Sequence, residues 1–117
     1  MLINDKEYLN LRNEAFECIR NAQYSAVLSM NHALIVRNLN IGKLIISKSV
    51  WGNKFIDNLA KDIKMEFPRM TGFSVRNLKY MKKFALEFKE DDIEEYGLAG
   101  ITWYHHMALM DKTVDKT

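Results

Sequence analysis

The sequence is poor in cysteine, proline and glycine, and it has no long apolar run. It contains one cysteine, one proline and five glycines among 117 residues. One cysteine excludes an internal disulfide, and so few turn formers disfavour a β-rich fold. No apolar run approaches the roughly 18–20 residues of a membrane span, and no stretch resembles a secretory leader. We therefore expect an all-α, cytoplasmic protein without membrane contact.

Length and charge limit the function classes. A chain of this length suits a single domain, residues 1–117, whose core needs neither metal nor disulfide. The net charge is only +2, so attraction to nucleic acid would have to come from local clusters of cations. Cys18 lies among apolar residues, which predicts a buried, unreactive thiol.

The first third of the chain lacks helix breakers. Residues 9–46 contain no proline, and their only glycine is Gly42. Small and apolar residues recur every three or four positions in two adjacent seams, the first of which is Leu11, Ala15, Cys18, Ala22, Ala26, Ser29, Ala33, Arg37, Asn40 and Leu44. This seam predicts one long, nearly straight helix, with a bend or break near residues 29–31. Because it would be about three times the average length, its N-terminal half should outrun the core and need a partner, either a second copy of the chain or a domain downstream of it.

A second helix is predicted over residues 51–67, followed by a tight turn. Its apolar face comprises Phe55, Ile56, Leu59, Ile63 and Phe67, with Trp51 as a core anchor. Pro68 should end it, because proline lacks an N–H and restricts the residue before it. Gly72 permits a reversal, and Ser74 is suited to cap the next helix.

The helix after Ser74 has two distinct faces. Its inward stripe is predicted to be Leu78, Met81, Ala85 and Phe88. Five basic residues and no acidic one lie between positions 69 and 83. A helix–turn–helix with a cationic second helix can enter the major groove of DNA, with lysines on phosphates and Arg76 near a base edge. The candidate nucleic-acid-binding residues are Arg69, Arg76, Asn77, Lys79, Tyr80, Lys82 and Lys83. An ordinary solvated face would have a similar composition.

Several segments resemble one known family. These are IGKLI at 41–45, WGNKFIDNLAKDIKMEFP at 51–68, GFSVRNLKYMKKF at 72–84 and TWYHHMALMDK at 102–112. Over about residues 10–115 the chain resembles the N-terminal domain of the bacterial YhcG-like family. The resemblance implies a helix–turn–helix or winged-helix-like domain that binds DNA and precedes a C-terminal PD-(D/E)xK nuclease domain. Residues 96–100 offer little strand material, so any wing should be short or absent.

The last part of the chain combines an acidic run with a final helix. Six acidic residues lie between positions 87 and 95, where a solvated loop or short helix is expected. Thr102 should cap a helix over residues 103–112, with Trp103, Met107 and Met110 facing inward.

Searches for catalytic or metal-binding patterns give no candidate. Asp62-Ile63-Lys64 and Glu87-Phe88-Lys89 match the (D/E)xK tripeptide, but on helices their end residues point in different directions. His105 and His106 are adjacent and diverge, and His32 stands alone, so structural roles are expected for all three. We predict no catalytic residues, no metal, no cofactor and no enzymatic activity for this chain.

Three functions are consistent with these patterns. The leading hypothesis is a DNA-binding module that positions a tethered nuclease. The alternative is a protein–protein interaction or dimerisation domain that uses the long alanine-rich helix and does not bind nucleic acid. In a third, the same cations recognise RNA or a structured nucleic acid by its shape.

Overall fold

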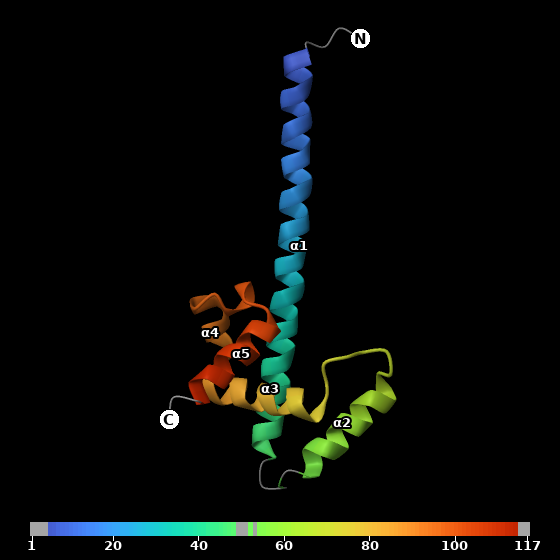
Figure 1. Ribbon diagram of the computed structural model, residues 1–117, viewed down its shortest axis with the longest axis vertical. Helices are drawn as coiled ribbons and strands as arrows, with labels where there is room; N and C mark the ends of the chain where they lie inside the picture. Colours follow the sequence, from blue (N-terminus) through green and yellow to red (C-terminus); the bar gives the residue numbers. More distant parts are fainter. Residues whose placement is uncertain (1–4, 49–51, 53, 115–117) are drawn as a thin grey trace.

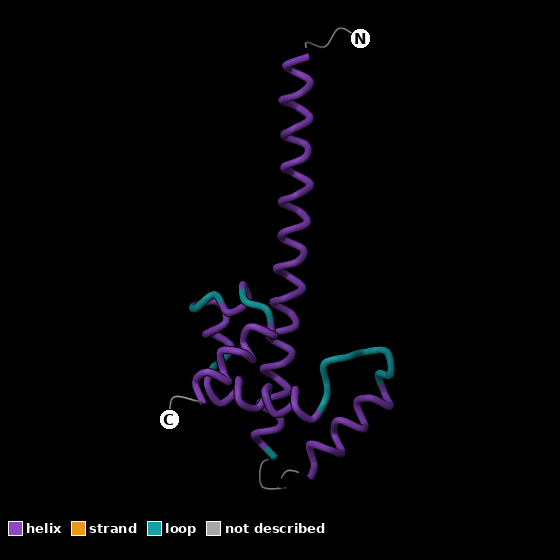
Figure 2. The backbone as a smooth tube through the Cα atoms, in the orientation of Figure 1, coloured by secondary structure: helices purple, strands orange, loops and turns teal. Residues whose placement is uncertain are grey.

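Helices make up all the regular structure that the computed structural model describes, which covers residues 5–48, 52 and 54–114. The elements are α1 (Asp5–Ser47), α2 (Lys54–Glu66), α3 (Val75–Glu87), α4 (Glu90–Glu95), the 3-10 helix η2 (Leu98–Gly100) and α5 (Trp103–Val114) (Figure 1). No strand occurs within these described ranges (Figure 2). The all-α prediction is confirmed, and the segment where a wing would lie forms a turn and η2.

Helix α1 is unbroken over 43 residues, so the predicted bend or break at residues 29–31 is wrong. Asn31, which sits in that stretch, uses its side-chain amide to donate to the Ala99 carbonyl and, at 3.0 Å, to the Ile101 carbonyl. Its side chain therefore ties α1 to the η2 region and does not compete with the helix backbone.

The N-terminal half of α1 projects away from the rest of the chain (Figure 1). Every residue from 5 to 30 is exposed, and we call this stretch the free half of α1. The remaining described residues, from 31 onward, form the head. The radius of gyration is 20.6 Å, against about 13 Å for a compact chain of this length. The prediction that the long helix outruns the core therefore agrees with the structure. Cys18 lies in the free half and is exposed, which corrects the expectation of a buried thiol, because no element covers this part of α1.

Helices α1 and α3 cross at very close range and form the centre of the head. The face of α1 that α3 and its neighbours bury consists of Ile35, Asn38, Leu39, Gly42 and Ile45. At Gly42 a Cβ atom would overlap the backbone carbonyl of Met81 and would lie 2.8 Å from the Cβ of Ala85. Only glycine permits this approach. The first seam is not the core face, since Leu44 at its end is 66% exposed.

The core of the head centres on Phe84, a residue that the predicted inward stripe of α3 omits. Its ring lies 5.4 Å from the Trp103 ring, 5.2 Å from His106 and 4.9 Å from Phe88, centroid to centroid. The predicted stripe residues Leu78 and Met81 are fully buried, whereas Ala85 and Phe88 are only partly buried. In α5, the predicted inward residues Trp103, Met107 and Met110 are buried.

The connection between α2 and α3 is not the tight turn that the sequence suggested. It spans residues 67–74, against the three or four residues usual in a helix–turn–helix. Pro68 follows the end of α2, and Gly72 takes a φ of 93°, a conformation that side chains rarely adopt. Phe73 then packs under the guanidinium of Arg37, 4.7 Å from its ring centroid to the Arg37 Cζ. This contact holds the loop in an extended path.

Helix α2 is attached to the head more loosely than predicted. Of its expected apolar face, Ile56 is buried, while Phe67, just after the helix, is 51% exposed. The others, Phe55, Leu59 and Ile63, are half-buried. The expected anchor Trp51 lies outside the described residues. Among the helices that the structure describes, none is long and apolar enough to cross a membrane.

Candidate nucleic-acid interface

The start of α3 is built as the sequence predicts. The Ser74 Oγ accepts a hydrogen bond of 3.2 Å from the backbone N–H of Asn77. This bond satisfies one of the N–H groups that a helix leaves free at its first turn. The first turn contains no acidic residue, and Arg76 in it is exposed. Leu78, Met81 and Phe84, on the inner side, fix which residues face outward.

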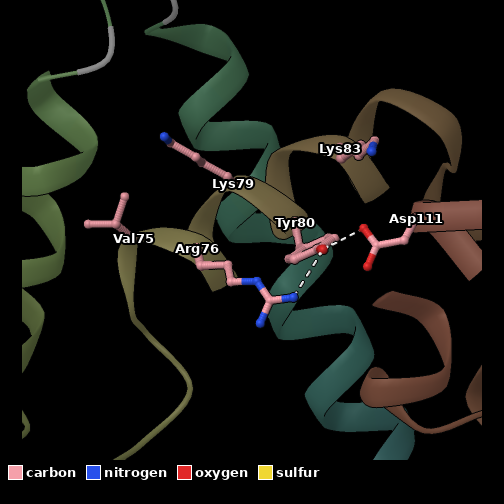
Figure 3. A pocket seen from close by; sticks show the side chains of 6 residues that line it. All are labelled: Val75, Arg76, Lys79, Tyr80, Lys83 and Asp111. Carbon is pink, nitrogen blue, oxygen red and sulfur yellow. Dashed lines mark hydrogen bonds between the residues drawn. The ribbon is translucent and has the colours of Figure 1, made fainter. Parts of the chain in front are cut away.

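The outer face of α3 borders a shallow pocket (Figure 3). We call it the cationic pocket, and its lining residues are Val75, Arg76, Lys79, Tyr80, Lys83 and Asp111. Four of these are candidates that the sequence placed together: Arg76, Lys79, Tyr80 and Lys83. Their spacing of three, four and seven positions puts them on one side of a helix, which explains why the pattern identified them.

Two of the pocket residues are held in place by a short chain of contacts. Arg76 Nη2 donates to the Tyr80 hydroxyl at 3.5 Å, and its Cζ lies 5.4 Å from the centroid of the Tyr80 ring. The Tyr80 hydroxyl in turn donates to Asp111 Oδ1, which joins α3 to α5. Figure 3 shows Arg76 turned toward Tyr80, while Lys79 extends to the other side. An aromatic ring and a guanidinium are thus positioned before any ligand arrives.

Asp111 is the pocket residue that the sequence reasoning missed. It lies 31 positions after Tyr80 and on a different helix, so no spacing within α3 could have indicated it. Its carboxylate adds one negative charge to a pocket with three cations, Arg76, Lys79 and Lys83. The pocket keeps a net positive charge, and no acidic residue of α4 lines it.

Three other candidates do not line the pocket. Arg69 is exposed in the loop between α2 and α3, and Lys82 is half-buried on the flank of α3. The side-chain carbonyl of Asn77 accepts a hydrogen bond of 3.3 Å from the indole Nε1 of Trp103. Asn77 therefore anchors α3 to α5.

Two of the three histidines, His105 and His106, make the hydrogen bonds expected of structural residues. His106 is buried, and its Nε2 shares a hydrogen bond of 2.9 Å with the Leu98 carbonyl. His105 makes a bond of 2.7 Å between its Nδ1 and the hydroxyl of Thr102, and Thr102 also accepts from the His105 backbone N–H. This contact confirms Thr102 as the cap of α5.

No metal site emerges from the part of the chain that the structure describes, where no group of three or more His, Cys, Asp or Glu side chains converges. Asp62 and Lys64 are exposed on α2, and Glu87 is the last residue of α3. Neither tripeptide lies on a strand.

Outside the pocket, burial lowers the pKa of Arg37, whose guanidinium also donates to the side-chain oxygen of Asn38.

Comparison with known proteins gives one match. The model of the DUF1016 N-terminal domain family matches residues 14–117, nearly the whole chain and all of the head. No curated protein and no solved structure matches it. The match is to an N-terminal, helical domain and not to a nuclease domain.

Proposed function

Because the chain belongs to the DUF1016 N-terminal domain family, the YhcG-like family of the sequence resemblance, we propose that it is a DNA-binding module. In this proposal it binds duplex DNA through the outer face of α3 and positions a tethered PD-(D/E)xK nuclease domain. The observation that supports it is the cationic pocket, in which Arg76, Lys79 and Lys83 lie on one face of a single helix.

The dimensions of the pocket suit a phosphate backbone. From Arg76 to Lys83 the helix rises by about 10 Å, at 1.5 Å for each residue. Along the duplex axis one strand carries a charge every 3.4 Å or so, and the strand winds around that axis as it rises. Three cations spread over about 10 Å can therefore reach several phosphates of one backbone. The buried residues Leu78, Met81 and Phe84 hold the other side of α3 against the core, which leaves Arg76 and Lys79 exposed and Lys83 half-buried.

The contacts of Arg76 favour a second, more specific role. In DNA-binding helices, residues near the N-terminus of the helix reach the base edges. Arg76 is in the first turn of α3, and an arginine can donate two parallel hydrogen bonds to a guanine. The Tyr80 ring and hydroxyl hold its guanidinium, so less side-chain entropy is lost on binding. The α2–α3 loop is too long for a tight helix–turn–helix. In this proposal α3 alone therefore forms the interface.

Fluorescence anisotropy with a labelled duplex tests the proposal. Three phosphate contacts predict a log–log slope of affinity against salt of roughly −3, a loss of about 40-fold between 50 and 200 mM salt. The triple variant Arg76→Glu, Lys79→Glu, Lys83→Glu should not bind measurably. The matched control is Lys43→Glu, Lys61→Glu, Lys64→Glu, because these exposed lysines lie outside the pocket and the change in net charge is the same. The control should retain most of the affinity.

Two results would overturn the proposal. One is a wild-type chain that binds no duplex at low salt, and the other is an equal loss in the two triple variants, which would mean that net charge alone governs binding. Circular dichroism checks that both variants keep their helices. If single-stranded RNA or a branched duplex competes better than linear duplex DNA, the ligand is of that class and the duplex assignment is wrong.

A further inference from the structure

The free half of α1 carries an apolar stripe that no part of the head covers. The stripe runs at intervals of three and four residues through Tyr8, Leu11, Ala15, Ile19, Ala22, Ala26 and Met30 and ends just beyond the free half at Ala33, and all eight residues are exposed. These intervals put the eight side chains on one face of the helix. The larger ones are well exposed in water: Leu11 is 61% exposed, Ile19 57% and Met30 74%.

The stripe and the core face of α1 lie on opposite sides of the helix. Ala33, at the end of the stripe, is exposed, whereas Ile35, two positions later, is fully buried. Residues two apart on a helix differ by about 200°, so these two point in nearly opposite directions. The chain's own core therefore cannot reach the stripe, and a partner can approach it without displacing α3 or α5.

Such an exposed helix needs a partner for its stability. Most of the stability of a protein helix comes from packing of its apolar face, and isolated helices are marginal in water. The described helices of the head have at most 13 residues, too few to cover a stripe of this length. None of the described elements of this chain covers the stripe.

We propose that the stripe packs against the same stripe of a second copy of this chain. Residues 21–36 contain no Asp, Glu, Lys or Arg, so two copies bring no like charges together there. The rest of the free half is nearly neutral, with four acidic and three basic residues, and so offers no field for a strongly charged partner. A second copy also has the same eleven-residue period, and the small side chains at Ala15, Ala22 and Ala26 permit close approach of the two helices.

The size of the contact sets its expected strength. The 26 residues of the free half extend about 39 Å, and a helix presents a strip about 10 Å wide. Two copies thus bury about 800 Å² in projection, below the roughly 1,200–2,000 Å² of standard interfaces. A contact of this size lies among the weak, transient pairs, so its detection requires a concentration series.

Analytical ultracentrifugation of the full chain from about 1 to about 300 µM tests the pairing. We expect the wild type to shift from monomer to dimer, and Ala26→Glu to remain monomeric because it places a charge in the contact. The matched control is Asn21→Glu, which adds the same charge to an exposed position about 140° away around the helix and should dimerise as the wild type does.

A second measurement does not depend on the variants. Amide hydrogen exchange in residues 15–28 should slow as the protein concentration rises, because pairing stabilises that stretch, while the core of the head should not change. A wild-type monomer across the whole range overturns the proposal, and so does a dimer that Ala26→Glu leaves intact. Neither result depends on nucleic acid, since the stripe shares no residue with the cationic pocket.

Discussion

Gly42 of α1 lies directly against the backbone carbonyl of Met81 of α3. No side chain separates the two helices at this point, and Gly42 is buried in spite of its position inside a 43-residue helix. Glycine costs a helix interior roughly 1 kcal/mol relative to alanine. The close crossing explains why glycine is nevertheless needed here.

We predict that Gly42→Ala destabilises the protein. The gain in helix propensity is about 1 kcal/mol, but the new methyl group would overlap the Met81 carbonyl, which belongs to the backbone and cannot rotate away. Overlap with a backbone atom belongs at the upper end of the about 1–3 kcal/mol that overpacking costs. The net loss of about 2 kcal/mol should lower the midpoint of thermal unfolding by about 5–10 °C. Gly100→Ala is the control, because a Cβ there meets no atom within 4 Å and should leave the midpoint nearly unchanged.

Phe84→Ala should lower the free energy of unfolding more than Phe67→Ala does. Phe84 is fully buried between the rings of Phe88, Trp103 and His106, and its truncation should cost about 3–5 kcal/mol. Phe67→Ala removes the same atoms from a half-exposed position at the end of α2 and should cost much less. Urea denaturation followed by circular dichroism gives both free energies of unfolding. Equal losses would contradict the placement of the core at Phe84.

Loss of the Ser74 cap on α3 should lower the stability of the protein less than Phe84→Ala does. An aspartate at position 74 should restore the lost stability. Ser74→Ala leaves the Asn77 N–H without its acceptor, at a cost of about 1 kcal/mol. Ser74→Asp keeps an acceptor and places a negative charge at the N-terminus of the helix, which favours it. We expect thermal unfolding to rank wild type and Ser74→Asp together above Ser74→Ala. A Ser74→Ala variant as stable as the wild type would mean that the cap contributes nothing.

Asp111→Asn should strengthen the binding of nucleic acid if the cationic pocket is the interface. Among the described residues, Asp111 is the only carboxylate that lines the pocket, and asparagine keeps an oxygen that can accept from the Tyr80 hydroxyl. One exposed charge contributes about 0.2–1 kcal/mol, so we expect a gain in affinity of up to about fivefold by anisotropy at low salt. Asp62→Asn on α2 is the control for net charge. A gain of the same size in the control would argue against a role for the pocket.

The sequence predicted what depends on periodicity within one helix. The grouping of Arg76, Lys79, Tyr80 and Lys83 follows from their spacing, and the cap at Ser74 follows from residue type. Asp111 could not be predicted, because its place in the pocket depends on how α5 packs against α3.

The errors have a common physical cause. Periodicity shows that a helix has an apolar side, but not which element covers it. Cys18 was therefore expected to be buried, although none of the described residues packs over the free half of α1. The inward stripe of α3 was likewise placed through Ala85 and Phe88, although the helix is rotated enough to make Phe84 its centre.

The backbone contact at Gly42 also connects the distant end of α1 to the cationic pocket. Because no flexible layer separates α1 from α3 there, α3 cannot slide or roll along α1 without losing that contact. The long helix is therefore a stiff lever whose tip, at Asp5, lies about 55 Å from the crossing. A restraint that tilts this tip therefore also tilts α3. The orientation of the face that carries Arg76 can thus be changed by a contact made outside the head.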